Sequence, residues 1–384
     1  MSDSTIDTIS ELVLLVVKTF IPQFTMLYSL AAALLLGRAL AVDRLLGFNA
    51  KPLVENRTID EIYKAALAEG GVVTLWHGGD ETNQRDSLKE AFEKQFPGMT
   101  LNLTVDLSKY LDGKIDEQVA WGNVTVDSVM LQTTHDFTRW AQHGVLLNYA
   151  PNNFDKIRPA FKDSTSASYY GTEILWLSNV WNTKKLPDAN FDTFQEFLKP
   201  EYKDRIVLAY PNDDDAILYA FDIIMQQHGT AWFDKLLAQN PRWVRGTQTP
   251  ATLLLNDTED VAVTFTTIVG FDPIENANQT FPTDGQFVSW AQTGGILADA
   301  PHPEGAKLLH NWILSDDYQK SLGWSVRGDI PRPEGVPDMM SLPTTNTPDF
   351  PRWMQDRSKV ERLRFWFENK LGTAQGLSPL KDNM

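Results

Sequence analysis

The sequence predicts an α/β protein built from two lobes, because buried strands alternate with amphipathic helices along two successive stretches of the chain. The first stretch begins at residue 71 and ends with a helix around Phe137 and Trp140, and the second covers 172–266. A segment rich in Pro, Asn, Asp and Ser lies between them, at residues 150–170. Such alternation is typical of mostly parallel sheets with helices on both faces, which meet their ligands at the carboxyl ends of the strands. At 384 residues, with 42% hydrophobic and 22% charged composition, the chain is long enough to bury two cores.

In the first stretch, short apolar runs predict strands at 71–76, 100–107 and 126–131. The glycine pair Gly78-Gly79 ends the first of these strands. Asp80 offers a cap for a helix that ends before Pro97-Gly98, and its apolar residues recur four positions apart, which predicts a buried face. Two more helices are expected, over 112–121 and around Phe137 and Trp140.

The second stretch repeats the pattern and then returns to the first lobe. Strands are predicted over 172–181, 205–210, 260–266 and 286–298, and helices over 192–199, 214–227, 230–239, 251–255 and 303–314. The rest of the chain is proline-rich and then helical at about 354–371. We therefore expect lobe I to comprise 60–165 and 286–335, lobe II to comprise 170–283, and a C-terminal extension with one helix to cover 336–384.

Composition excludes several classes of function. The chain has no cysteine, which rules out disulfides, cysteine-based zinc sites, iron–sulfur clusters and thiol nucleophiles. The formal net charge of -16 would repel phosphate backbones, and no cluster of basic residues interrupts the acidic background. Nucleic acid is therefore not an expected partner, and no motif predicts a cofactor.

An N-terminal segment has the composition of a signal peptide. From Met26 an apolar run leads to Ala39-Leu40-Ala41, which fits the small-residue rule for cleavage and places the mature start near Val42. Residues 1–25 form an upstream extension, and Met26 is the expected start of translation. The alternative joins both apolar runs into a signal anchor, but Lys18, Pro22 and Arg38 interrupt the span of about 20 apolar residues that a membrane needs. We expect a secreted, extracellular chain without stable membrane insertion after cleavage.

Five asparagines stand in N-glycosylation sequons, namely Asn56, Asn102, Asn123, Asn256 and Asn278. Together with the signal peptide they indicate a eukaryotic secretory route. A bacterial periplasmic protein with accidental sequons remains the alternative.

Six stretches in order and spacing resemble the bacterial extracellular solute-binding proteins, in the group that includes ferric-ion, thiamine and polyamine binders. These stretches are GGVVTLWHGGDETN with KEAFEKQFPGMTLNL, GNVTVDSVMLQTTHDFTRWAQHGVLLNYAP, SNVWNTKKLP, KPEYKDRIVLAYP, EDVAVTFT and APHPEGAKLLHNWILSDDYQKSLG. The resemblance implies a periplasmic-binding-protein-like II fold, with two lobes joined by two hinge crossings and the ligand between them. It also implies a substrate-binding component of an ABC transporter, here as a secreted, fungal-like member.

Departures from the family suggest the charge of the ligand. Ferric-ion binders place a tyrosine pair after the strand that here is VAVTFT, where this chain has Thr266 and Thr267. Relatives that hold an anion follow the strand equivalent to RIVLAY with small polar residues, where this chain has Asp213, Asp214 and Asp215. Three carboxylates favour a cationic organic ligand, such as a thiamine-like compound or a polyamine, or a divalent metal.

The candidate ligand residues follow strands, at the edge where this fold keeps its ligand. They are His77, Gly78, Gly79, Asp80, Gln132, Thr133, Trp176, Asp213, Asp214, Thr266 and Thr267. Each also has a structural interpretation: the glycines permit a turn, the acids cap a helix, and Trp176 belongs in a core.

Two other functions remain open. A secreted interaction or sensor protein would keep the two-lobed architecture with a degenerate cleft. An acid–base enzyme would use His77 and a cleft aspartate. No catalytic signature motif occurs in the mature chain, so we do not expect an enzyme and name no catalytic or metal-binding residue.

Overall fold

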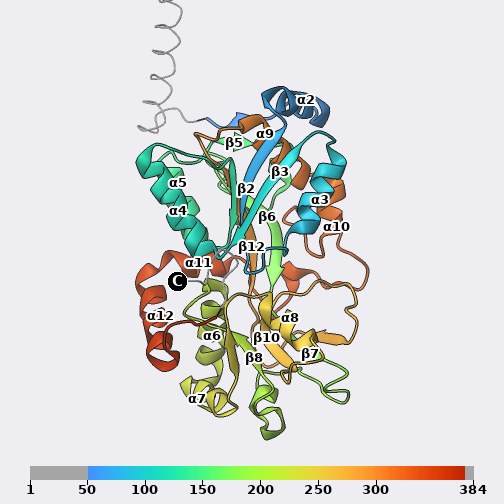
Figure 1. Cartoon of the computed structure of the whole chain (residues 1–384), viewed down its shortest axis with the longest axis vertical. Helices are drawn as coiled ribbons and strands as arrows, with labels where there is room; N and C mark the ends of the chain where they lie inside the picture. Colours follow the sequence, from blue (N-terminus) through green and yellow to red (C-terminus); the bar gives the residue numbers. More distant parts are fainter. Residues whose placement is uncertain (1–50, 377–384) are drawn as a thin grey trace, which may run out of the picture. The chain divides into compact units, whose positions relative to one another are not determined.

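The computed structural model describes residues 51–376 (Figure 1). The expected signal peptide, its cleavage after Ala41 and the alternative start at Met26 lie outside the described residues. The described part is a mixed α/β protein of two lobes, as the sequence predicts.

Lobe I is built on a five-stranded sheet with the strand order β3-β2-β4-β12-β6. β2 (Val72–Gly78) lies parallel to β3 (Thr100–Asp106) and β4 (Ser128–Leu131). β12 (Ser289–Ile296) lies antiparallel to β4 and to β6 (Tyr170–Trp176). The strand directions are therefore more mixed than the predicted, mostly parallel sheet, because the chain leaves lobe I through β6 and returns through β12.

Helices cover both faces of this sheet. α2 (Ile59–Glu69), α3 (Asp86–Gln95) and α9 (Pro303–Ile313) contribute to one hydrophobic cluster, and α4 (Ser108–Trp121) and α5 (Thr134–Gln142) contribute to another. A short helix, α10 (Asp316–Ser321), follows α9. Apolar residues four positions apart predict a buried face on α3. This prediction is confirmed, since Leu88 and Phe92 are both buried.

Lobe II holds a three-stranded antiparallel sheet of β10 (Val263–Thr267), β7 (Ser178–Asn182) and β11 (Ala277–Thr280). β8 (Val207–Ala209) and β9 (Arg242–Val244) form a parallel pair beside it. Three helices accompany these strands: α6 (Asp215–His228), α7 (Thr230–Ala238) and α8 (Thr249–Leu255). The short strands β9 and β11 do not appear in the sequence prediction.

Two predicted elements take a different form. The single strand expected over 172–181 is two strands, β6 and β7, joined by Leu177, so one continuous segment serves both lobes. The helix expected over 192–199 is replaced by 3₁₀ turns at Glu196–Leu198 and Pro200–Tyr202. Pro200 explains this difference, because a proline disfavours the helical conformation of the residue before it, and Lys199 is extended.

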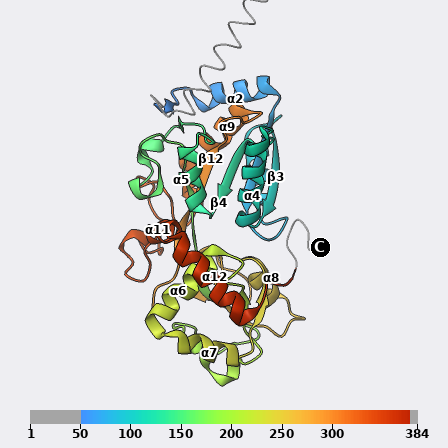
Figure 2. The same ribbon diagram turned by 90° about the vertical axis from the view of Figure 1, so that its left-hand side faces the viewer.

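The C-terminal segment packs into the core of lobe II. It contains two helices, α11 (Asp349–Gln355) and α12 (Arg357–Leu371), where the sequence predicts one. The chain breaks at Asp356, whose side chain accepts a hydrogen bond from the Lys359 backbone N–H. α12 lies along lobe II and α11 lies where the two lobes meet (Figures 1 and 2). Both helices bury aromatic side chains among those of α6 and α7.

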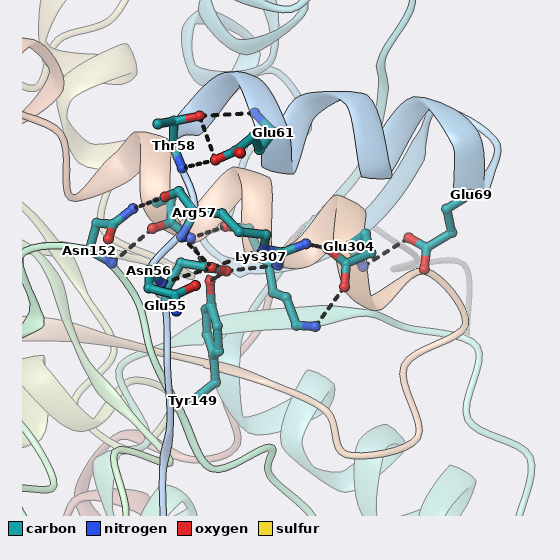
Figure 3. Close-up of polar contacts among 11 residues, drawn as sticks. Glu55, Asn56, Arg57, Thr58, Glu61, Glu69, Tyr149, Asn152, Glu304 and Lys307 are labelled. Carbon is teal, nitrogen blue, oxygen red and sulfur yellow. Dashed lines mark hydrogen bonds and ion pairs between the residues drawn. The ribbon is translucent and has the colours of Figure 1, made fainter.

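A polar network attaches the start of the described chain to lobe I (Figure 3). β1 (Leu53–Val54) pairs with β5 (Tyr149–Ala150), and the Tyr149 hydroxyl donates to Glu55 at 2.6 Å. Arg57 forms ion pairs with Glu55 at 2.8 Å and with Glu304 of α9 at 2.7 Å. Burial would raise the pKa of Glu55, but the hydrogen bonds from Arg57 and Tyr149 outweigh it and lower that pKa to about 2.

Candidate functional site

A small cavity of about 20 Å³ lies between the two lobes. Its lining comes from the ends of β2 and β4, the starts of α3 and α4 and the strands β6 and β12, and from the turns before α6 and α8 and after β10 in lobe II. The lining residues are Gly78, Gly79, Asp80, Gln84, Arg85, Leu107, Ser108, Gln132, Leu175, Asp214, Gly246, Thr247, Ile268, Trp290 and Gln292. This volume is close to the space for one water molecule. A larger ligand therefore fits only when the lobes move apart.

Asp80 connects the lobes by capping a helix of lobe II. Its carboxylate accepts hydrogen bonds from the backbone N–H groups of Gln248 at 3.0 Å and Thr249 at 2.9 Å, and from the Thr249 hydroxyl at 3.0 Å. These groups begin α8, so Asp80 caps this helix and not the one that follows it in the sequence, which starts only at Asp86. Burial raises the pKa of Asp80 to about 6.

Asp214 makes a second connection between the lobes. It caps α6 by accepting a hydrogen bond from the Ile217 backbone N–H at 3.0 Å, and it accepts another from Gln132 Nε2 of lobe I at 2.7 Å. The side-chain oxygen of Gln132, Oε1, in turn accepts from the Ala216 backbone N–H at 3.0 Å. Burial also raises the pKa of Asp214 to about 6.

The neighbouring acids have cationic partners. Asp213 pairs with Arg245 of lobe II at 3.0 Å and with Lys109, which reaches across from lobe I, at 2.5 Å. Asp215 pairs with Arg364 of α12. Within residues 51–376, neither Asp80 nor Asp214 forms an ion pair, so these two buried carboxylates carry the uncompensated charge of the cavity.

Arg85 is the basic residue in the cavity lining, and its charge is matched by Glu173. The guanidinium approaches the two Glu173 oxygens at 2.9 and 3.2 Å. His77 lies behind this pair, with Nε2 at 3.4 Å from Glu173, and it is buried outside the cavity lining. Burial lowers the pKa of His77, so the imidazole stays neutral at ordinary pH.

Some predicted ligand residues lie in the protein core. Trp176 is buried and stacks on Phe271, with 4.6 Å between ring centroids. Thr133 is buried at the start of α5. Neither residue lines the interlobe cavity.

Thr266 and Thr267 are buried in β10 and support lobe II from inside. The Thr266 hydroxyl accepts from the Ala209 backbone N–H at 2.8 Å, and the Thr267 hydroxyl donates to the Thr247 carbonyl at 2.7 Å. Thr267 thus positions the turn at Thr247, which lines the cavity, but Thr267 itself does not line it.

The sequence prediction missed Gly246, which lines the cavity and lies against Asp80 of the opposite lobe. It follows β9, a three-residue strand too short to be recognised from its apolar pattern. Its φ angle of +78° favours glycine, and a Cβ atom there would collide with Cβ of Asp80. The run Gly-Thr-Gln-Thr-Pro at the start of α8 is typical of a turn that leads into a helix, and it could have indicated this position from the sequence.

A family profile of bacterial extracellular solute-binding proteins matches residues 87–352. The chain belongs to this family. Its members are solute-binding proteins found outside the cytoplasmic membrane, and the predicted resemblance is thereby confirmed at the level of the family. Among curated proteins, no sequence match was found.

Solved structures share the fold of this solute-binding protein at low sequence identity. A substrate-binding protein of an ABC transporter from Agrobacterium tumefaciens has a TM-score of 0.65 at 14% identity, covering 80% of this chain and 96% of its own. The periplasmic binding protein AfuA from Actinobacillus pleuropneumoniae, with fructose-6-phosphate bound, has a TM-score of 0.63 at 18% identity, covering 79% and 99%. A putative spermidine/putrescine ABC transporter protein from Listeria monocytogenes has a TM-score of 0.56 at 19% identity, covering 78% and 99%.

No helix within residues 51–376 of this solute-binding protein combines the length and hydropathy that a membrane crossing needs.

The two raised pKa values predict a pH dependence of stability. Because the pKa of Asp80 is about 6 in the folded protein and 3.8 ordinarily, the folded state holds this proton more tightly, and stability increases as the pH falls through 6. The free energy of unfolding of the wild type, minus that of Asp80→Asn, should therefore rise by about 1 kcal/mol between pH 7.5 and pH 5. Chemical denaturation at both pH values measures this difference. An equal difference in unfolding free energy at the two pH values would contradict this prediction. The contribution of the histidines cancels in the difference, because the same histidines titrate in both proteins.

Proposed function

We propose that this protein is a secreted solute-binding protein that captures a small cationic organic ligand between its two lobes. The observation that carries this proposal is the pair of buried carboxylates, Asp80 from lobe I and Asp214 from lobe II, which line one cavity without a cationic partner.

The physical argument concerns the cost of burying charge. A carboxylate taken out of water needs hydrogen bonds and a countercharge, and Asp80 and Asp214 have the hydrogen bonds alone. An ammonium or a cationic ring placed between the two carboxylates would supply the missing positive charge. The two lobes could then close around it. A phosphate in this position would be repelled by both groups.

The solved structures leave the charge of the ligand open, since one holds fructose-6-phosphate and another is described as a putative spermidine/putrescine transporter protein. The residues of this chain favour the cation. Among residues 51–376, no group of three or more His, Asp or Glu side chains is placed to hold a metal ion, which favours an organic cation over a divalent metal.

The arrangement of His77 supports a binding protein over an acid–base enzyme. This imidazole is buried against Glu173 and does not reach the cavity, so it is not placed to exchange a proton with a bound molecule. A eukaryotic secretory route belongs to the same proposal, and the exposed sequon asparagines support it.

The proposal is tested by thermal unfolding of the chain from Val42 onward with putrescine, spermidine, thiamine, Mg²⁺, Mn²⁺ or fructose-6-phosphate. A ligand at a hundred times its dissociation constant stabilises the folded state by about 2.7 kcal/mol, which raises the midpoint by several degrees. We expect such a rise with one of the organic cations and none with the sugar phosphate.

Two substitutions then locate the site. Asp80→Asn and Asp214→Asn keep the size of the side chain and remove its charge, and each should weaken binding of the active cation at least tenfold, or about 1.4 kcal/mol. Asp260→Asn, an exposed acid on lobe II, is the matched control and should bind like the wild type. A shift with the anion alone, or unchanged binding in both cavity variants, would reject the proposal; no shift with any compound would favour an interaction protein.

A further inference from the structure

The five sequon asparagines share one property in the folded protein: all of them are exposed, namely Asn56, Asn102, Asn123, Asn256 and Asn278. Exposure alone does not distinguish them from asparagines outside sequons, because Asn179, Asn182 and Asn311 are buried whereas Asn83, Asn190 and Asn346 are exposed. Exposure is what a folded chain needs at a residue that carries carbohydrate. One of the five, Asn278, also lines a cavity.

Asn278 lines a cavity in lobe II. This cavity has a volume of about 260 Å³, many times the roughly 30 Å³ that a water molecule takes up in the liquid. It lies outside the interlobe site, and its lining is Val180, Val269, Phe271, Asp272, Pro273, Ile274, Ala277, Asn278 and Gln279. The residue that would carry the sugar is therefore part of the cavity wall.

The side chain of Asn278 is oriented by its neighbour. Its Oδ1 atom accepts a hydrogen bond from the Gln279 backbone N–H at 2.9 Å. This leaves the amide nitrogen, the atom to which an N-linked sugar attaches, without a hydrogen bond to the described residues.

The cavity wall has the two kinds of surface that an N-acetylhexosamine presents. Phe271, Pro273 and Ile274 form an apolar side, on which the C–H face of a sugar ring and its acetyl methyl group can pack. Asp272 is exposed at the same cavity and offers acceptor oxygens for ring hydroxyls.

We propose that Asn278 carries an N-linked glycan whose first N-acetylglucosamine is seated in this cavity against Phe271 and Ile274. β11, which contains Asn278, pairs only with β7 and is an edge of its sheet. A glycan there covers both an apolar cavity and an unpaired strand edge, two features through which secreted proteins aggregate. This inference rests on the secretory route in the proposed function and not on the charge of the ligand.

The test uses the full chain secreted from insect cells, with glycopeptides identified by mass spectrometry. We expect Asn278 to be occupied. An endoglycosidase that cuts between the first two sugars should trim the Asn278 glycan at least tenfold more slowly than the Asn123 glycan in the folded protein, and at the same rate after denaturation. Asn123 is a suitable reference because it is exposed just after α4 and lines no described cavity.

A variant separates seating in the cavity from local crowding. Ile274→Ala removes part of the apolar wall and leaves the sequon intact, so it should speed trimming at Asn278 and leave Asn123 unchanged. An unoccupied Asn278, equal trimming at both sites in the folded protein, or no effect of Ile274→Ala would overturn the inference. None of these readouts depends on which solute binds between the lobes, so the two proposals fail separately.

Discussion

Replacing Gly246 by alanine should keep the two lobes from closing. A Cβ atom at this position collides with Cβ of Asp80, which is fixed to the backbone of the opposite lobe and cannot swing away as a long side chain would. Relief requires the lobes to separate, and separation breaks the hydrogen bonds from α8 to Asp80. We expect small-angle scattering to give a larger radius of gyration than the wild type, and cation binding to weaken at least tenfold.

The control for this variant is Gly229→Ala. Gly229 has nearly the same φ angle, +79° against +78° for Gly246, but an added Cβ there meets no atom within 4 Å. Both variants therefore place an L-residue at a positive φ, which is strained, and only one carries the collision. If the two variants scatter and bind alike, the contact between Gly246 and Asp80 does not govern closure.

Replacing Phe367 by alanine should destabilise the protein as strongly as a substitution in the centre of lobe II. Phe367 of α12 is fully buried, and its ring lies 5.1 Å from that of Phe233 and 5.5 Å from that of Phe221. Removing a buried phenylalanine side chain costs about 3–5 kcal/mol, which lowers the unfolding midpoint by roughly 5–10 °C. Calorimetry or circular dichroism on the purified chain measures this shift.

Phe365 provides a matched control on the same helix. It is 65% exposed, so Phe365→Ala should change stability by no more than about 0.5 kcal/mol. Similar losses in both variants would mean that α12 is not part of the lobe II core. The expected contrast supports the proposal that α12 is an integral part of lobe II, where the sequence alone suggests an appended extension.

Local patterns predicted most of the elements that build the fold. Apolar runs predicted β2, β4 and β8, and helical spacing predicted α3, α6 and α9. These predictions succeeded because the hydrophobic periodicity of a strand or a helix depends only on residues close in the sequence. Prediction failed where local signals were weak or opposed. β9 and β11 are three and four residues long, and Pro200 ends the run that resembles a helix at 192–199.

The candidate site was predicted in part. Gly78, Gly79, Asp80, Gln132 and Asp214 line one cavity, because residues that follow strands gather at the same edge of a sheet. Position after a strand does not decide the direction of a side chain, however. His77 and Thr266 occupy comparable positions and lie in the protein interior.

By itself the sequence determined the α/β class, the order of the elements, the absence of thiol chemistry and the likeness to the solute-binding family, all of which depend on composition and local spacing. Only the tertiary structure decided which acid has which partner. Asp213 is paired by Lys109 from 104 positions away, and Asp80 caps a helix that begins 169 positions later. Such pairings are set by how the two lobes meet, and no local pattern in the chain records that geometry.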